Sequence, residues 1–220
     1  MSYFALEPSS FGQQLAGYMS QLKQQLIDSF VASAIPPEVL SSSDPCLVHI
    51  SDTPSVFYPT LFRLLEKIKP HVLIHTGDMV DHLKLQNHAY LYNLYQEQLQ
   101  QFIGRLENLP VDIIYLVPGN HDDPDLISRI CRRCRVIPEY SLVQFGAFKL
   151  GLAHEPQNLP PKADFALYGH SLDEPPATAG QPLSGLKNIN ILLPDGRIYF
   201  IPYPRGTDVA RGIKPRPRKL

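Results

Sequence analysis

Acidic, amide and imidazole side chains follow the apolar runs of this sequence one after another. The first run, "CLVHIS", leads directly to Asp52, and the second leads to "TGDMVD". The third leads to "PGNHDD", and two later runs end in "LAHEP" and "LYGHSL". Each short motif alone is typical of a turn, but together they offer oxygen and nitrogen ligands that suit zinc, manganese or iron. Their repetition at successive run ends predicts one shared cation site.

The elements that must position these residues are readable from the periodicity of the chain. Apolar runs at 46–51, 71–76 and 111–117 alternate with helical patterns at 56–69, 85–108 and 123–134. Short apolar runs separated by helices are typical of a parallel sheet that is buried on both faces. Ligands of such sheets bind at the carboxyl ends of the strands. The polar residues that follow the runs are therefore expected to meet at one edge.

The second half of the chain reads mostly as strands. Residues 140–155 contain two strand-like pieces around a glycine, and residues 164–170 contain another. Residues 189–203 predict a hairpin that turns at Pro194-Asp195-Gly196. Because no linker separates the two halves, the sequence predicts one α/β domain over residues 45–205.

Two segments outside this domain have patterns of their own. Residues 10–33 carry apolar side chains at steps of three and four, as in an amphipathic helix. We expect residues 1–44 to form a helical extension that covers its own domain or binds a protein partner. Residues 206–220 are basic and rich in proline, and they predict a disordered tail.

Composition excludes several classes of function. The formal net charge of the 220 residues is -1, which does not favour binding to nucleic acid or to an acidic membrane. No apolar run reaches the roughly 18 residues that a membrane span needs. Three cysteines are too few for a disulfide framework, and the N-terminus does not read as a secretory signal. A cytoplasmic location is therefore expected.

Taken in order, the motifs resemble those of the calcineurin-like metallophosphoesterases. The family pattern D-x-H, G-D-x-x-D, G-N-H-D, a lone His and G-H-x-H is present as "DTP", "GDMVD", "GNHD", "AHEP" and "GHSL". The resemblance implies an α/β fold of two mixed β-sheets packed face to face and flanked by helices, a four-layer sandwich. It also implies hydrolysis of a phosphorylated substrate, a phosphate mono- or diester, by a metal-activated water.

The resemblance further implies which residues hold metal. The family binds two metal ions that share one aspartate, and Asp78 corresponds to that shared carboxylate. Asp52 corresponds to a ligand of the first ion, and Asn120, His154 and His170 correspond to the remaining ligands of the second. The expected cofactor is one or two divalent ions of manganese, zinc, iron or nickel.

Two catalytic residues are implied by the same match. His121 corresponds to the group that donates a proton to the leaving oxygen, and Asp122 is expected to orient its ring. Asp81 is expected to fix the loop rather than to touch metal.

The sequence departs from the family pattern at two ligand positions. Pro54 and Leu172 stand where the family has histidines, and neither offers a ligand atom. Both positions belong to the first ion, so the second site alone keeps all its protein ligands. Nearby donors could replace the missing ones: Ser171, Asp173, Glu174 or Glu155. Two functions follow: a phosphoesterase working with one intact metal site, or a weakened or inactive relative acting as a binding module.

A second cluster of reactive residues lies at "CRRC", where Cys131 and Cys134 are placed in the expected helix 123–134. Zinc would need a second pair of ligands, and no further cysteine pair exists. A redox dithiol and a pair of half-buried helix cysteines remain as alternatives. The arginines around this motif are either a substrate-attracting patch or a solvated helix face.

Overall fold

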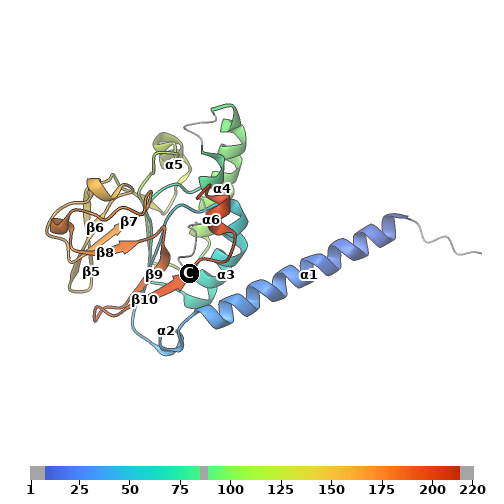
Figure 1. The fold of residues 1–220 in the computed structure, drawn as a ribbon, viewed down its shortest axis with the longest axis horizontal. Coiled ribbons are helices and arrows are strands. Elements are labelled where there is room, and N and C mark those ends of the chain that lie inside the picture. Colours follow the sequence, from blue (N-terminus) through green and yellow to red (C-terminus); the bar gives the residue numbers. More distant parts are fainter. Residues whose placement is uncertain (1–7, 85–88, 214–220) are drawn as a thin grey trace, which may run out of the picture.

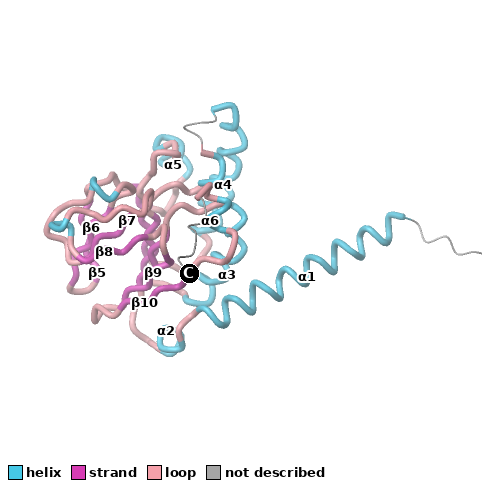
Figure 2. The backbone as a smooth tube through the Cα atoms, viewed as in Figure 1, coloured by secondary structure: helices cyan, strands magenta, loops and turns pink. Residues whose placement is uncertain are grey.

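The computed structural model describes residues 8–84 and 89–213, which form two β-sheets with helices beside them (Figure 1). Figure 2 shows most helices gathered on one side of the strands. The elements, in chain order, are as follows. The helices are α1 (Pro8–Ala34), α2 (Pro37–Ser41), α3 (Tyr58–Ile68), α4 (Tyr92–Glu107), α5 (Pro124–Ile130) and α6 (Thr207–Ala210). Short 3-10 helices are η1 (Ser55–Phe57), η2 (Asp81–Leu83), η4 (Ala89–Leu91), η5 (Pro156–Asn158) and η6 (Ala177–Ala179).

The larger sheet has the strand order β10-β9-β1-β2-β3-β4. Its strands are β1 (Leu47–Ile50), β2 (Val72–His75), β3 (Ile113–Leu116), β4 (Arg135–Val136), β9 (Asn188–Leu192) and β10 (Ile198–Pro202). Strands β1 to β4 are parallel, whereas β9 pairs antiparallel with both β1 and β10. The parallel strands and the terminal hairpin are thus present as predicted. The sequence does not predict β4, because two residues are too few to show a period.

The smaller sheet has the order β5-β6-β7-β8, formed by β5 (Ser141–Phe145), β6 (Phe148–Leu152), β7 (Phe165–Tyr168) and β8 (Gln181–Ser184). Its β5 and β6 are antiparallel, and β6, β7 and β8 are parallel. Leu150 and Leu167 from this sheet share an apolar core with Leu47 and Ile74 from the larger one. The expected α/β fold of two mixed sheets packed face to face is therefore confirmed.

The outer faces of the two sheets are covered differently. Helices α3, α4 and α5 pack on the outer face of the larger sheet, where Leu61 and Phe102 contribute to one core with Val48. Side chains alternate across a strand, so Ala166 and Tyr168 point away from the inner core of the smaller sheet. They cluster with residues in and beside η5 and η6. The outer face of the smaller sheet is thus covered by short 3-10 helices, where a four-layer sandwich was expected to have a layer of helices.

Helix α1 leaves the body of the molecule, as Figure 1 shows at the blue end of the chain. Contacts with the domain come from its last turns, where Val31 is buried and Arg63 of α3 donates to Asp28 at 2.7 Å. Further out, Tyr18 and Leu26 are exposed by 59% and 72%. The predicted helix is present, but most of it does not cover its own domain. Among the described residues, no helix is both long and apolar enough to cross a membrane.

The described part of the expected C-terminal tail is folded. Residues 206–213 contain α6, and Arg211 at its end is 2% exposed. The Arg211 guanidinium donates to the carbonyl oxygens of Ser51, Asp52 and Leu186, and it lies 3.9 Å from the centroid of the Tyr203 ring. The prediction of a disordered tail is therefore wrong for these residues, because composition does not reveal a buried anchor. Residues 214–220 lie outside the described part of the chain.

Two histidines in the larger sheet are buried and neutral. His75 Nδ1 accepts from the backbone N–H of Gly77 at 3.2 Å, which leaves its Nε2–H to donate to Thr53 Oγ1 at 2.9 Å. A second proton, on His75 Nδ1, would point at the backbone N–H of Gly77, which is itself a hydrogen-bond donor. Burial lowers the pKa of His75 to about 3, and burial together with the nearby His75 lowers that of His49 to about 3 as well.

We therefore expect stability to fall as the pH drops below the ordinary histidine pKa of 6.5. The unfolded chain binds a proton there and the folded chain does not, so each histidine removes about 1.4 kcal/mol of unfolding free energy per pH unit. Urea unfolding of wild type and His75→Gln between pH 7 and pH 4 measures this effect. The variant should show a shallower slope, while the exposed-histidine control His71→Gln keeps the wild-type slope. Equal slopes in all three proteins would contradict the assignment.

Candidate metal centre

The carboxylates that follow β1 and β2 lie side by side at one edge of the larger sheet. Backbone N–H groups of Asp52 and Thr53 donate to the carbonyl oxygens of Gly77 and Asp78, each at 2.9 Å, which joins the two strand exits. Asp52 and Asp78 are 3% and 2% exposed. Both adopt positive φ angles, 52° and 56°, a conformation that is uncommon for residues with a side chain. Backbone strain of this kind is concentrated at functional sites.

An amide and two imidazoles from three other loops close on the same point. Asn120 Oδ1 lies 2.9 Å from His154 Nε2 and 2.9 Å from His170 Nδ1. The two imidazole nitrogens are 3.2 Å apart, and His154 Nε2 is 3.5 Å from Asp78 Oδ2. The four side chains expected to surround the second ion are therefore adjacent. Ligand atoms of Asp52, Asp78 and His154 all lie within 4.8 Å of one another, which brings the fifth residue to the same site.

The donor set fits a divalent cation. His154 Nδ1 lies 2.7 Å from the carbonyl oxygen of Thr76, so Nδ1 carries a proton and Nε2 faces the centre, as in metal-binding histidines. Burial opposes a charge on this ring, but the Asp78 carboxylate raises the pKa of His154 to about 10. The proton on His154 Nε2 thus lies among hydrogen-bond acceptors, and a metal ion can replace it there.

Two glycines allow the strand exits to approach this closely. A Cβ on Gly119 would overlap Asp78 Oδ1, and a Cβ on Gly169 would overlap Ser51 Oγ and Asp52 Oδ2. Neither clash involves a flexible chain end that could move away, because both carboxylates are buried. The glycines of "GNHD" and "YGHS" are therefore required by the site itself.

Asp122 has a different role from the expected one. Its carboxylate accepts hydrogen bonds from the backbone N–H groups of Asp78, Met79 and Gly119, at 2.8, 3.1 and 2.9 Å. The Tyr95 hydroxyl donates to it as well, at 3.3 Å. No hydrogen bond joins Asp122 to the His121 ring in the described contacts, so the prediction that Asp122 orients His121 is wrong. Asp122 instead holds the two loops that carry Asp78 and His121.

His121 lies beside the cluster with one ring nitrogen unused. Its backbone N–H donates to Asp78 Oδ1 at 3.0 Å. Within the described residues, His121 Nδ1 is buried and has no hydrogen-bond partner. Burial lowers the pKa of His121 despite the nearby Asp78 carboxylate, which favours the neutral ring when no ligand is bound. The His121 ring nitrogen Nδ1 is therefore available to bond to a ligand rather than to stabilise the fold.

The two substituted positions leave the side of Asp52 with fewer ligands. Pro54 is buried at the start of η1, and half-buried Leu172 lines a surface hollow with Leu186 and Lys187. The candidate replacements are engaged elsewhere. Ser171 and Asp173 bond to each other, Glu174 pairs with Lys187, and Glu155 accepts from Gln157. The described contacts therefore give no support to replacement of the missing ligands.

A buried carboxylate, Asp81, and a lysine, Lys84, lie beside this depleted half. The sequence predicts that Asp81 fixes the loop, and it assigns no role to Lys84. Asp81 is 1% exposed and donates its backbone N–H to the Thr53 carbonyl, while Lys84 donates to its Oδ1. In the described residues, Asp81 Oδ2 is buried without a partner. Burial and the charge of Asp52 raise the pKa of Asp81 to about 7. The spacing from Asp81 to Lys84, one helical turn, is the only signal in the sequence.

Arg211 is the second positioning residue that the sequence did not reveal. It holds the carbonyl oxygens of Ser51 and Asp52 from a segment about 160 residues away along the chain. The positive φ of Asp52 is thereby fixed from outside the site. No motif marks this arginine among the other basic residues near the C-terminus.

Three solved structures align with this chain. One crystal structure aligns with a TM-score of 0.52 at 12% sequence identity, covering 73% of this chain and 100% of the other, which shows a shared fold. The E. coli phosphoesterase Yfce aligns with a TM-score of 0.46 at 17% identity, covering 70% and 96%. The Pseudomonas putida nuclease MPE aligns with a TM-score of 0.37 at 20% identity, covering 70% and 87%. No curated protein sequence matches the chain.

A family model for calcineurin-like phosphoesterases matches residues 47–214. The matched range begins with β1 and ends beyond Arg211, so it contains every residue of the site described above. The family acts on phosphorylated substrates with divalent metal ions, in agreement with the ligand types gathered at the strand ends. Since the match covers most of its length, the chain belongs to the calcineurin-like phosphoesterase family.

Proposed function

We propose that this chain hydrolyses a phosphate mono- or diester with one firmly held divalent ion. The observation that carries the proposal is the contact of Asn120 Oδ1 with both His154 and His170, next to Asp78. A manganese, zinc, iron or nickel ion bound there would polarise the phosphate and lower the pKa of an attacking water. Asp52 would complete the site from its other side.

The protein residues supply the rest of the chemistry. The Thr76 carbonyl holds the His154 ring with its second nitrogen toward the centre, and Asp122 fixes the two loops around Asp78. His121 has an unused ring nitrogen and would donate a proton to the leaving oxygen. A bound phosphate, which is an anion, raises the pKa of this ring and so favours the protonated form that can donate.

The alternative function is a binding module that has lost catalysis. The specific observation in its favour is α1, whose apolar side chains at Tyr18, Met19 and Leu26 are exposed. The loss of two ligand side chains agrees with it, because a single ion provides weaker activation than a pair. Turnover decides between the two functions: no hydrolysis with any of the four metals would favour the binding module.

We expect His121→Ala to lower kcat for an alkyl phosphate by about 10²–10⁴-fold, the usual contribution of a general acid. With an aryl phosphate the loss should be much smaller, because an aryl leaving group departs without a proton. Metal content of the purified variant, measured by elemental analysis, should equal that of wild type. The exposed His71→Ala serves as the control. An equal loss for both leaving groups, or a loss of metal, would assign His121 a different role.

A further inference from the structure

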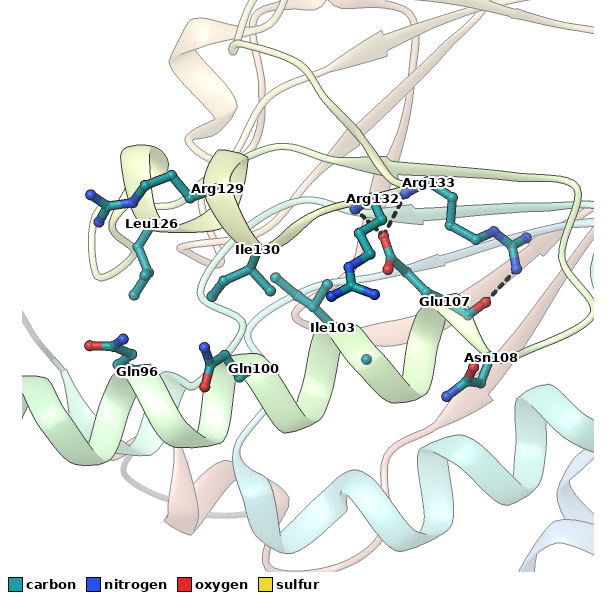
Figure 3. Close-up of a pocket in the computed structure, with 11 residues that line it drawn as sticks. Gln96, Gln100, Ile103, Glu107, Asn108, Leu126, Arg129, Ile130, Arg132 and Arg133 are labelled. Carbon is teal, nitrogen blue, oxygen red and sulfur yellow. Dashed lines mark hydrogen bonds between the residues drawn. The ribbon is translucent and has the colours of Figure 1, made fainter.

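The loop "CRRC" wraps around the carboxylate of Glu107, the last residue of α4. Glu107 Oε1 accepts hydrogen bonds from the backbone N–H groups of Arg132, Arg133 and Cys134, at 2.8, 2.8 and 3.1 Å. Figure 3 shows this carboxylate between the two arginines. Helix α5 ends at Ile130, so the cysteines lie on this loop and not in a helix, contrary to the sequence prediction. Glu107 is therefore fixed in place by the segment that carries both thiols.

The loop brings three ligand atoms together. The sulfur atoms of Cys131 and Cys134 and a carboxylate oxygen of Glu107 all lie within 4.8 Å of one another. All three residues are half-buried, and Glu107 lines a hollow of about 910 Å³ that opens to solvent. Two cysteines separated by two residues have the spacing of zinc ligands. The sequence shows no further ligands for these two cysteines, but the fold places Glu107 of α4 beside them.

The charges at this cluster favour a cation. A carboxylate oxygen of Glu107 lies within 4.8 Å of both sulfur atoms, so its negative charge would attract a divalent ion to this place. The Arg133 guanidinium does not fill this place, because it donates to the carbonyl oxygens of Glu107, Leu109 and Val111.

We propose that Glu107, Cys131 and Cys134 form a second metal site, separate from the phosphoesterase centre, for a thiophilic divalent ion such as zinc. Water would complete the four ligands that zinc adopts. An ion held there would tie the end of α4 to the loop that follows α5. The three backbone hydrogen bonds to Glu107 act as the outer contacts that hold a metal ligand in its orientation.

Cobalt(II) titration of the full chain, kept reduced with a phosphine, tests the proposal. Sulfur-to-metal charge-transfer absorption reports cysteine ligands only and is blind to the carboxylate, amide and imidazole donors of the phosphoesterase centre. We expect one such ion per chain, displaced by zinc. We expect no absorption from Cys131→Ser/Cys134→Ser and an affinity lowered about tenfold or more in Glu107→Gln. Cys46→Ala, which removes the remaining cysteine, should bind as wild type does.

Thermal unfolding provides a second readout, because an ion that binds only the folded chain raises the midpoint. Zinc should raise the midpoint of a metal-site variant of the phosphoesterase centre, Asp78→Asn, and should not raise it when both cysteines are also serine. Absence of the charge-transfer band in the reduced chain would overturn the proposal. So would an unchanged affinity in Glu107→Gln, or a chain whose intact mass shows a disulfide that re-forms in the presence of zinc.

Discussion

Asp78→Asn is expected to lower hydrolysis of an aryl phosphate by a factor on the order of 10² to 10³ or more, the range found when one electrostatic stabiliser is removed. Asparagine keeps the size of the side chain and one oxygen, but it removes the negative charge that faces His154 Nε2 at 3.5 Å. A divalent ion at this site would then be held chiefly by neutral donors. Its affinity, measured by calorimetry, should fall together with turnover.

The matched control is Asp112→Asn, an exposed aspartate just before β3. It makes the same chemical change without touching the site, so metal affinity and turnover should remain at the wild-type level. Far-ultraviolet circular dichroism and the urea midpoint establish that Asp78→Asn is folded. If the folded Asp78→Asn variant retained both metal and activity, the proposal that Asp78 binds the metal ion would have to be abandoned.

The convergence of the site residues could be predicted because it follows from strand geometry. Adjacent parallel strands deliver their carboxyl ends to one edge, so Asp52 and Asp78 had to meet once β1 and β2 were recognised. The same reasoning places Asn120 after β3. His154 and His170 follow β6 and β7 of the other sheet, and their arrival at the same point depends on how the two sheets pack.

Several contacts could not be predicted because they depend on side-chain direction or on distant segments. Asp122 follows His121 in sequence, but its carboxylate turns toward the backbone N–H groups of Asp78 and Gly119. Arg211 reaches Asp52 from a segment whose composition is typical of a tail. Strand β8 was missed because its first two residues are exposed and the next two are buried, which gives no alternation.

The depleted half of the centre shows what the two substitutions remove. Asp52 and Asp81 bring carboxylates to this side, and Lys84 donates to Asp81. The ammonium group of Lys84, bonded to Asp81, offsets part of the negative charge on this side, as a cation would. We infer that this half is built for one positive charge from lysine rather than for a fully held second ion.

Restoring the family histidines should therefore create a second ion site. In a Cys131→Ser/Cys134→Ser background, which lacks the proposed cysteine site, we expect Pro54→His/Leu172→His to bind two ions per chain instead of one. We expect kcat to rise on the order of 10²-fold, the inverse of losing one electrostatic stabiliser. The backbone at Pro54, with φ of -76° and ψ of 148°, is accessible to any residue, and position 172 is in an irregular loop. The replacement at position 54 therefore requires no new backbone conformation.

Lys84 should oppose the second ion in this variant, because its ammonium group pairs with Asp81 and would repel a further cation beside that carboxylate. Adding Lys84→Gln is expected to tighten binding of the second ion, and adding Asp78→Asn is expected to abolish the gain. Elemental analysis gives the stoichiometry and aryl phosphate hydrolysis gives the rate. Two ions per chain in the Cys131→Ser/Cys134→Ser background without the restored histidines would show that the missing histidines do not limit this centre. A restored variant with a second ion and no faster turnover would show the same.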